Sequence, residues 1–175
     1  MPHLTLSRYE NPVLDWRGNK AAMLQAGLLT AAVALPSLCH LLNLPYRVAV
    51  PMHWPVLLAG LAYGWRSGLA AGFLSPLVSF ALSGMPAPMA LPQMCAELSA
   101  YGFAAGFARQ NLHLNSYLAV MSAAIAGRLA YAAGAIFLLN IPITATAAAL
   151  TPGLAAALAQ VAILPGLAKV WTAKN

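Results

Sequence analysis

Long apolar runs follow one another along almost the whole sequence, and their length restricts the fold more than any other feature. A helix needs about 20 mostly apolar residues to cross the hydrocarbon core of a bilayer, where every backbone polar group must be hydrogen-bonded within the helix. Runs close to this length cover residues 21–42, 48–65, 67–84, 90–109, 115–139 and 144–170. The sequence therefore predicts an all-α membrane protein with about six transmembrane helices.

Turn-forming residues separate most of these runs. The breaks fall at residues 43–45, 84–88, 110–115 and 140–142, while only residues 65–67 divide the second run from the third. Residues 1–20 are polar and mixed in charge, without the short apolar core and small-residue cleavage site of a signal peptide. We expect residues 1–20 to form a cytoplasmic leader and residues 21–175 to form a single six-helix transmembrane domain.

The composition agrees with a protein that meets lipid as well as water. Hydrophobic residues make up 61% of the chain and charged residues 7%, whereas soluble domains are about one quarter charged. The formal net charge of +6 is compatible with nucleic acid or with anionic lipid as a partner. The basic residues stand singly between apolar runs and form no basic patch, so we expect the lipid bilayer and no nucleic acid as a partner.

The distribution of Lys and Arg over alternate loops predicts the orientation, because cytoplasmic loops carry the excess of these residues. With the N-terminus inside, the outside has Arg47 alone, and the cytoplasmic side has Arg8, Arg17, Lys20, Arg66, Arg109, Lys169 and Lys174. This bias predicts that both termini are cytoplasmic, as an even number of spans requires.

Small residues recur at spacings of four, which allows helix backbones to approach closely. The glycines with this spacing are Gly60, Gly64, Gly68, Gly72, Gly102 and Gly106. In the first run, Ala22 and Ala26 begin a similar stripe. In a chain so rich in alanine, internal packing explains that stripe as well as contact with a partner does.

Two charges lie inside the apolar runs, Glu97 in the fourth and Arg128 in the fifth. Counted at about 1.5 Å per residue from the outer ends, Glu97 is roughly 10 Å deep and Arg128 roughly 16 Å. Intramembrane charges are expensive and usually functional, and each is the obvious partner for the other. We expect the two side chains to pair, either as a structural ion pair that fixes the helix register or as part of a ligand site.

Polar and soft side chains gather near the expected outer ends of the runs. Gln93, Glu97 and Tyr101 share one helical stripe, as do Arg128 and Tyr131. The candidate lining of an outward-open pocket is His53, Trp54, Met85, Met89, Gln93, Met94, Glu97, Tyr101, Arg128 and Tyr131. Taken singly, an interfacial histidine, a tryptophan of the aromatic belt and filler methionines explain several of them equally well.

No motif in the sequence indicates catalysis or a metal site. Cys39 and Cys95 lie in apolar runs without metal-ligand or disulfide spacing, and the four histidines are dispersed. An HExxH motif, a nucleophile beside a base and a glycine-rich phosphate loop are absent. We expect no catalytic residue, no cofactor and no metal, and any ATP hydrolysis would belong to another chain.

Several segments together resemble the substrate-specific S components of energy-coupling factor (ECF) transporters. The resemblance covers most of the chain, from about residue 21 to the end of the fifth run. The segments that carry it are Pro51-Met52-His53-Trp54-Pro55-Val56, the glycines at 60, 64, 68 and 72, Gly84-Met85-Pro86, Met94, Glu97-Leu98, Tyr101-Gly102, Gly106 and Gly127-Arg128.

The resemblance implies a six-helix, multi-pass subunit in the inner or plasma membrane of a prokaryote. It would capture a vitamin or related small molecule from outside and work with a membrane scaffold subunit and two cytoplasmic ATPase subunits. By the same resemblance, Ala22 and Ala26 would dock on the scaffold, and residues 84–93 would cover the site as a lid. Its substrate does not follow, because members read different molecules; Arg128 would suit a carboxylate, and an apolar pocket would suit a ring.

Two alternatives from other classes stay open at the level of the sequence. One is a structural or assembly protein of the membrane whose buried charges only fix packing. The other is a polytopic membrane enzyme that uses Glu97 and His53 as acid and base.

Overall fold

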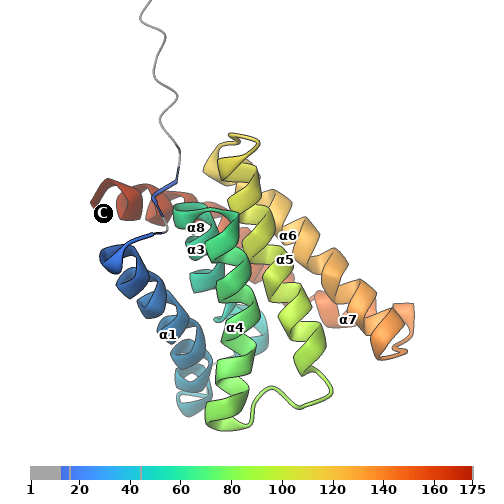
Figure 1. Cartoon of the computed structure of the whole chain (residues 1–175). Coiled ribbons are helices and arrows are strands. Elements are labelled where there is room, and N and C mark those ends of the chain that lie inside the picture. The colour runs from blue at the N-terminus through green and yellow to red at the C-terminus, as the bar shows by residue number, and fades with distance from the viewer. Residues whose placement is uncertain (1–12, 16, 44, 175) are drawn as a thin grey trace, which may run out of the picture.

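The computed structural model describes residues 13–15, 17–43 and 45–174, and all regular secondary structure in this part of the chain is helical, without a strand (Figure 1). The elements are α1 (Asn19–Leu41), α2 (Tyr46–Ala49), α3 (His53–Tyr63), α4 (Trp65–Ser83), α5 (Leu91–Gln110), α6 (Ser116–Ala133), the π-helical turn η1 (Gly134–Leu138), α7 (Ile143–Leu150) and α8 (Gly153–Lys174). The all-α fold class is thus confirmed. Most of the expected leader lies outside the described residues.

Within the described residues, three helical stretches are long and apolar enough to cross a membrane: Asn19–Leu41, Ser116–Leu138 and Gly153–Lys174. Helices α4 and α5 have similar lengths, 19 and 20 residues, but contain more Gly, Ser and Gln. Helix α3 has only 11 residues, about 16 Å, and does not cross a hydrocarbon core of about 30 Å. The count of six spans therefore stays a prediction.

Two of the expected helices are broken, and a proline lies at each break. The run at 48–65 divides into α2 and α3 where Val50 takes a φ of 44°, directly before Pro51. The run at 144–170 divides into α7 and α8, and α8 continues to Lys174. Pro152 has no backbone N–H for the i−4 bond, and the Thr151 N–H donates to the Ala148 carbonyl instead, at 3.3 Å.

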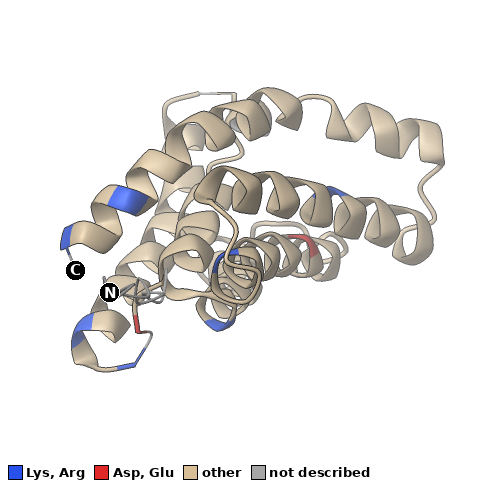
Figure 2. Cartoon of the chain, turned by 90° about the horizontal axis from the view of Figure 1, so that it is seen from above, with Lys and Arg blue, Asp and Glu red and all other residues tan. Residues whose placement is uncertain are grey.

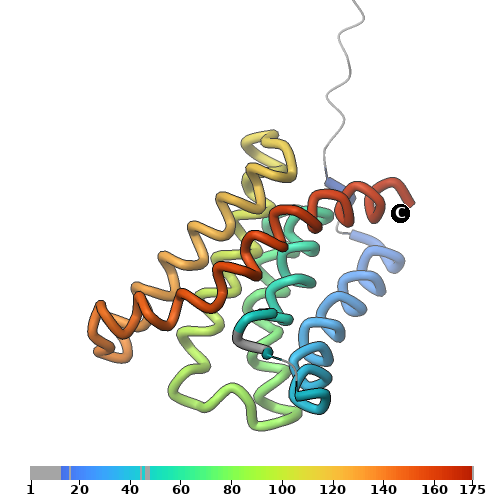
Figure 3. Tube along the Cα trace, turned by 180° about the vertical axis from the view of Figure 1, so that it is seen from behind, coloured from blue at the N-terminus to red at the C-terminus, as the bar shows by residue number. Residues whose placement is uncertain are grey.

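Helix α3 forms the centre of the bundle. Ten of its residues are buried, all except Trp54, and α1, α4, α5 and α8 pack around it. At its end the Tyr63 hydroxyl accepts a hydrogen bond of 3.1 Å from Trp171 Nε1, which fastens α8 to the core. Figure 3 shows α8 crossing the back of the bundle from the α7 corner to the C-terminal end.

The glycine spacing works as the sequence predicts, through direct contact of helix backbones. A Cβ on Gly68 would overlap the Gly102 carbonyl, and a Cβ on Gly102 would overlap the Gly68 carbonyl. Gly72 meets the Leu98 carbonyl in the same way, and Gly106 meets the backbone at residues 64 and 65. Helices α4 and α5 can therefore lie side by side only because both have glycine along this line of contact, the α4–α5 seam.

The small stripe on α1 faces outward. The helix buries Ala21, Leu28 and Ala32, whereas Ala22 and Ala26 are exposed, and no atom lies within 4 Å of the position that a Cβ on Gly27 would take. Internal packing therefore does not explain Ala22 and Ala26.

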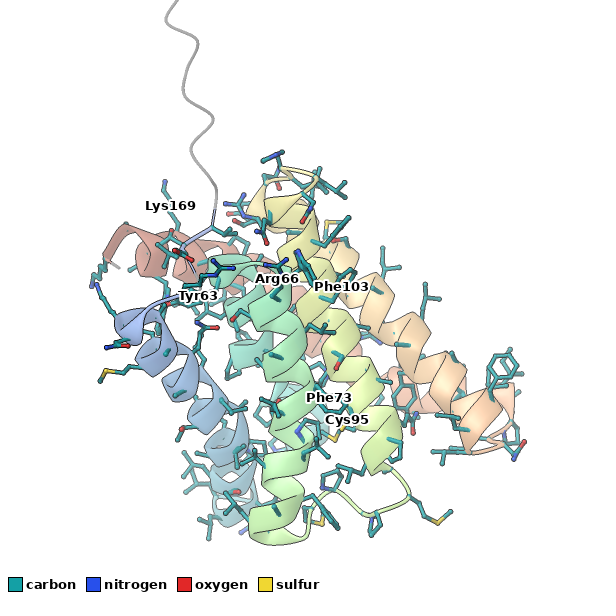
Figure 4. All side chains as sticks on the ribbon, in the orientation of Figure 1. Tyr63, Arg66, Phe73, Cys95, Phe103 and Lys169 are labelled. Atoms are coloured by element: carbon teal, nitrogen blue, oxygen red, sulfur yellow. The ribbon has the colours of Figure 1, made fainter. Side chains whose placement is uncertain are left out.

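The two ends of the bundle differ in charge. Lys and Arg are sparse along the helices (Figure 2), and Arg66 and Lys169 both lie toward the end that holds the two chain ends of the described part (Figure 4). The starts of α1 and α4 and the ends of α5 and α8 supply the basic residues there. The connection between α4 and α5 lies at the opposite end (Figure 1).

Candidate functional site

A cavity of about 410 Å³ opens at the end of the bundle that holds the α4–α5 connection. Helices α1, α3, α4, α5, α6, α7 and α8 all contribute to its walls, as do Val50, Pro51 and Met52 before α3. Met85, Pro86 and Ala90 of the α4–α5 connection close one side. The size lies within the usual range of small-molecule sites, about 300–1,000 Å³.

Eight of the ten candidate residues line this cavity: His53, Met85, Gln93, Met94, Glu97, Tyr101, Arg128 and Tyr131. Trp54 does not, because consecutive residues of a helix point about 100° apart and His53 occupies the inward position. Instead Trp54 Nε1 donates to the Ala49 carbonyl at 3.0 Å, and the ring packs on the main core. Met89 points away and is 79% exposed.

Glu97 contacts His53 at hydrogen-bond range, with 3.4 Å between His53 Nε2 and Glu97 Oε1. Their side chains are 6% and 15% exposed, so the contact is well shielded. The His53 ring also meets Tyr101 edge to face, with 4.7 Å between ring centroids. Because His53 begins the short helix α3 and Glu97 lies within α5, the break before α3 sets the position of this contact.

The expected ion pair between Glu97 and Arg128 is wrong. Arg128 Nη1 instead donates to the Leu150 carbonyl at 2.9 Å. Among the described residues, Arg128 contacts no carboxylate. Leu150 ends α7, where carbonyls have no partner within the helix. The break between α7 and α8, unforeseen from the sequence, supplies that carbonyl, and the two charges face the same cavity without touching.

The stripe Gln93, Glu97 and Tyr101 faces the cavity as the spacing of four predicts. Gln93 Nε2 donates to the Tyr131 carbonyl at 3.1 Å and so joins α5 to α6 just before η1. The Tyr101 ring lies against Gly127, where a Cβ would overlap it. Because residue 127 is glycine, the Tyr101 ring fits between His53 and α6.

Sequence reasoning missed several residues of the wall, above all Gln160 of α8. Ser79, Tyr101 and Gln160 are three of the polar side chains in the lining that are almost wholly buried, with exposed fractions of 5%, 4% and 2%. None of their side-chain polar atoms has a hydrogen-bond partner within residues 13–174 as described. Because these side chains line the cavity, their polar atoms are available to hydrogen-bond to a molecule bound there.

A signal for Gln160 exists in the sequence. It is the one amide in the apolar run of 144–170, and polar residues inside membrane helices tend to face an interior cavity. The prediction took its candidates from the second to the fifth run and from the connection at residues 84–93, and so passed over the sixth run.

The chemistry that the cavity offers is charge, hydrogen bonding and apolar contact. Among the described residues, no group of three or more His, Cys, Asp and Glu side chains is placed to hold a metal ion. The cavity thus has the features of a site for an organic molecule: a mostly apolar wall with a few convergent polar groups.

Comparison with known families gives one match, and it covers most of the chain. Residues 21–171 match the family model described as "ECF transporter, substrate-specific component". Comparisons with curated proteins and with solved structures give no match. Because the family model spans the cavity and every helix around it, the chain belongs to the family of substrate-specific components of ECF transporters.

Proposed function

We propose that the cavity binds a vitamin or related small molecule, captured from outside the cell for ATP-driven uptake. The observation that supports this most directly is the lining itself. Glu97, Arg128 and several polar groups that have no hydrogen-bond partner among the described residues converge on one cavity of about 410 Å³, at the end of the bundle opposite Arg66, Arg109 and Lys169.

Family membership gives the coarse role: the chain is a membrane-embedded, substrate-binding subunit of a transporter. The enzyme alternative, with Glu97 and His53 as acid and base, is set aside on that ground, although the two side chains do meet. In the proposed assembly, a scaffold subunit and two cytoplasmic ATPase subunits, all separate chains, supply the energy.

The proposed orientation places both termini in the cytoplasm and the cavity in the outer half of a prokaryotic plasma membrane. Arg66, Arg109 and Lys169 belong to the end of the bundle opposite the cavity, which fits the cytoplasmic excess of basic residues. In this orientation the 84–90 connection lies over the cavity on the outer side, where substrate would enter.

The proposed docking site for the scaffold is the exposed small stripe of α1. Ala22 and Ala26 lie on the outward face, and small residues let two helices approach closely in lipid. The stripe lies in the first two turns of α1, whereas Pro36 and His40, which line the cavity, lie near the other end of the same helix.

Mass spectrometry of small molecules that copurify with the detergent-solubilised protein tests the binding function. We expect one organic compound at close to one equivalent, and proteoliposomes with the scaffold and ATPase chains should accumulate it when ATP is inside. Binding without ATP-dependent uptake in the complete assembly would contradict the transport role.

A further inference from the structure

The two charges in the cavity belong to different walls, and each is held by the protein rather than by the other. Glu97 of α5 meets His53, and Arg128 of α6 meets the Leu150 carbonyl. If the charges existed only to neutralise each other, a direct contact would be the stable arrangement. The arrangement instead leaves two separate charged groups in one cavity, which we call the Arg128 pole and the Glu97 pole.

The Arg128 pole has free capacity to bind an anion. A guanidinium carries five N–H donors, and the bond to Leu150 is the one hydrogen bond of Arg128 in the described chain. Its Nη2 lies 3.5 Å from the position that a Cβ on Gly153 would take, beside the first turn of α8. A planar carboxylate or a phosphate matches the guanidinium fork, and the adjoining N-terminus of a 22-residue helix adds to the preference for an anion.

The Glu97 pole has free capacity to accept hydrogen bonds. The carboxylate contacts His53 through Oε1, and its other oxygen, Oε2, has no hydrogen bond within the described residues. A carboxylate offers about four lone-pair sites, so it can accept further donors. A basic nitrogen of a ligand would satisfy it and balance its charge.

The space between the poles is neither empty of polar groups nor wholly polar. Tyr101, whose hydroxyl has no hydrogen-bond partner among the described residues, lies beside His53, and Gln160 lies two turns after Gly153 on α8. Met85, Met94 and Tyr131 supply apolar contact. A molecule that spans the cavity would therefore carry an apolar body between its two charged ends.

We infer that the substrate is amphoteric: it carries an acidic group that binds Arg128 and a basic nitrogen that binds Glu97. A purely anionic substrate would satisfy Arg128 and leave the Glu97 carboxylate facing another negative charge. A purely cationic substrate would satisfy Glu97 and leave the Arg128 guanidinium facing another positive charge. This inference rests on the proposed function, because it presumes that the cavity is the substrate site.

The test uses the full-length protein in detergent, incubated with a water-soluble metabolite extract of the cells that encode it. The retained compound is released with solvent and passed over an anion exchanger at strongly alkaline pH, where an amine is neutral, and over a cation exchanger at acidic pH, where a carboxyl group is neutral, with detection by mass spectrometry. An amphoteric compound is held by both columns. A compound held by one column or by neither overturns the inference while leaving the binding function intact.

Variants then locate the two poles. Arg128→Gln and Glu97→Gln should each reduce retention of that compound by more than about tenfold, because each removes a charge-assisted hydrogen bond. Arg66→Gln removes a guanidinium outside the cavity and should change nothing. Full retention by a folded Arg128→Gln or Glu97→Gln protein contradicts the assignment. If the wild-type protein is folded and retains no compound at all, the proposed function fails, and the inference fails with it.

Discussion

His53 and Glu97 meet across α3 and α5, with 3.4 Å between Nε2 and Oε1, although 44 positions separate them in the sequence. The contact ties the first residue of the central helix to the middle of its neighbour. It also places Glu97, the one carboxylate of the described helices, on the cavity wall. One contact thus sets both the position of α3 and the negative pole of the site.

Replacing Glu97 by Gln should separate these two roles. The amide keeps the shape of the carboxylate and still bonds to the imidazole, so we expect the unfolding midpoint in detergent to change little. Substrate retention should fall, because the negative charge is lost. Met89→Gln, at an exposed position outside the cavity, is the control and should retain substrate normally. A large drop in the unfolding midpoint with unchanged retention would instead assign Glu97 a purely structural role.

Gln160→Leu should preserve stability and weaken binding. The Gln160 side chain is buried against the cavity, and its amide has no hydrogen-bond partner in the described chain. Leucine has a similar size and breaks no hydrogen bond of the described chain, so the ligand-free protein should unfold at the same temperature or higher. Affinity should fall, because the ligand loses a hydrogen bond. A destabilised variant with normal affinity would show that Gln160 supports packing alone.

Much of this arrangement was accessible from the sequence, because the physical causes are local. Apolar length predicted helices, and the spacing of Gln93, Glu97 and Tyr101 placed them on one face that does line the cavity. The glycines at 68 and 102 predicted close contact of helices, and their carbonyls do lie where a side chain would need to be.

What could not be predicted depends on where helices stop. Prolines at 51 and 152 were visible, but helices tolerate proline in membranes, so the sequence did not reveal which ones end a helix. Pro36, Pro76 and Pro165 remain inside α1, α4 and α8. The breaks decide the site, since they bring His53 to Glu97 and the Leu150 carbonyl to Arg128.

Gly102→Ala tests the seam between α4 and α5. The new methyl group would overlap the Gly68 carbonyl, which is backbone and cannot turn away. Overpacking of this kind costs about 1–3 kcal/mol, so the unfolding midpoint should drop clearly. Gly27→Ala is the matched control, because nothing lies within 4 Å of its added Cβ, and alanine in a helix is favoured by about 0.5–1 kcal/mol. Equal midpoints for the two variants would contradict the close packing of this seam.

The double substitution Ala22→Leu with Ala26→Leu should abolish uptake and leave binding intact. Both positions are exposed on α1, so leucine is tolerated by the isolated subunit, whereas a scaffold helix could no longer approach closely. The measurements are substrate retention by the purified subunit and copurification of the tagged scaffold. The same double change at Ala145 and Ala148, exposed on α7, is the control and should preserve both. Loss of substrate binding in the α1 variant would point to a structural role for the stripe.

Labelling of single introduced cysteines, in a variant that lacks Cys39 and Cys95, measures the membrane orientation. Asn111 follows α5 at the end of the bundle with Arg109, and Asn140 precedes α7 at the cavity end; both side chains are exposed. The basic residues at the first end predict that it faces the cytoplasm, where Lys and Arg are in excess. A membrane-impermeant maleimide added to intact cells should therefore label Asn140→Cys and should label Asn111→Cys only after the cells are opened. The reverse pattern would put the cavity on the cytoplasmic side, and a substrate taken up from outside could not then enter it directly. Cysteine at Ser67 is a poorer reporter, because that side chain is buried and its hydroxyl donates to Gln25 Oε1 at 2.7 Å.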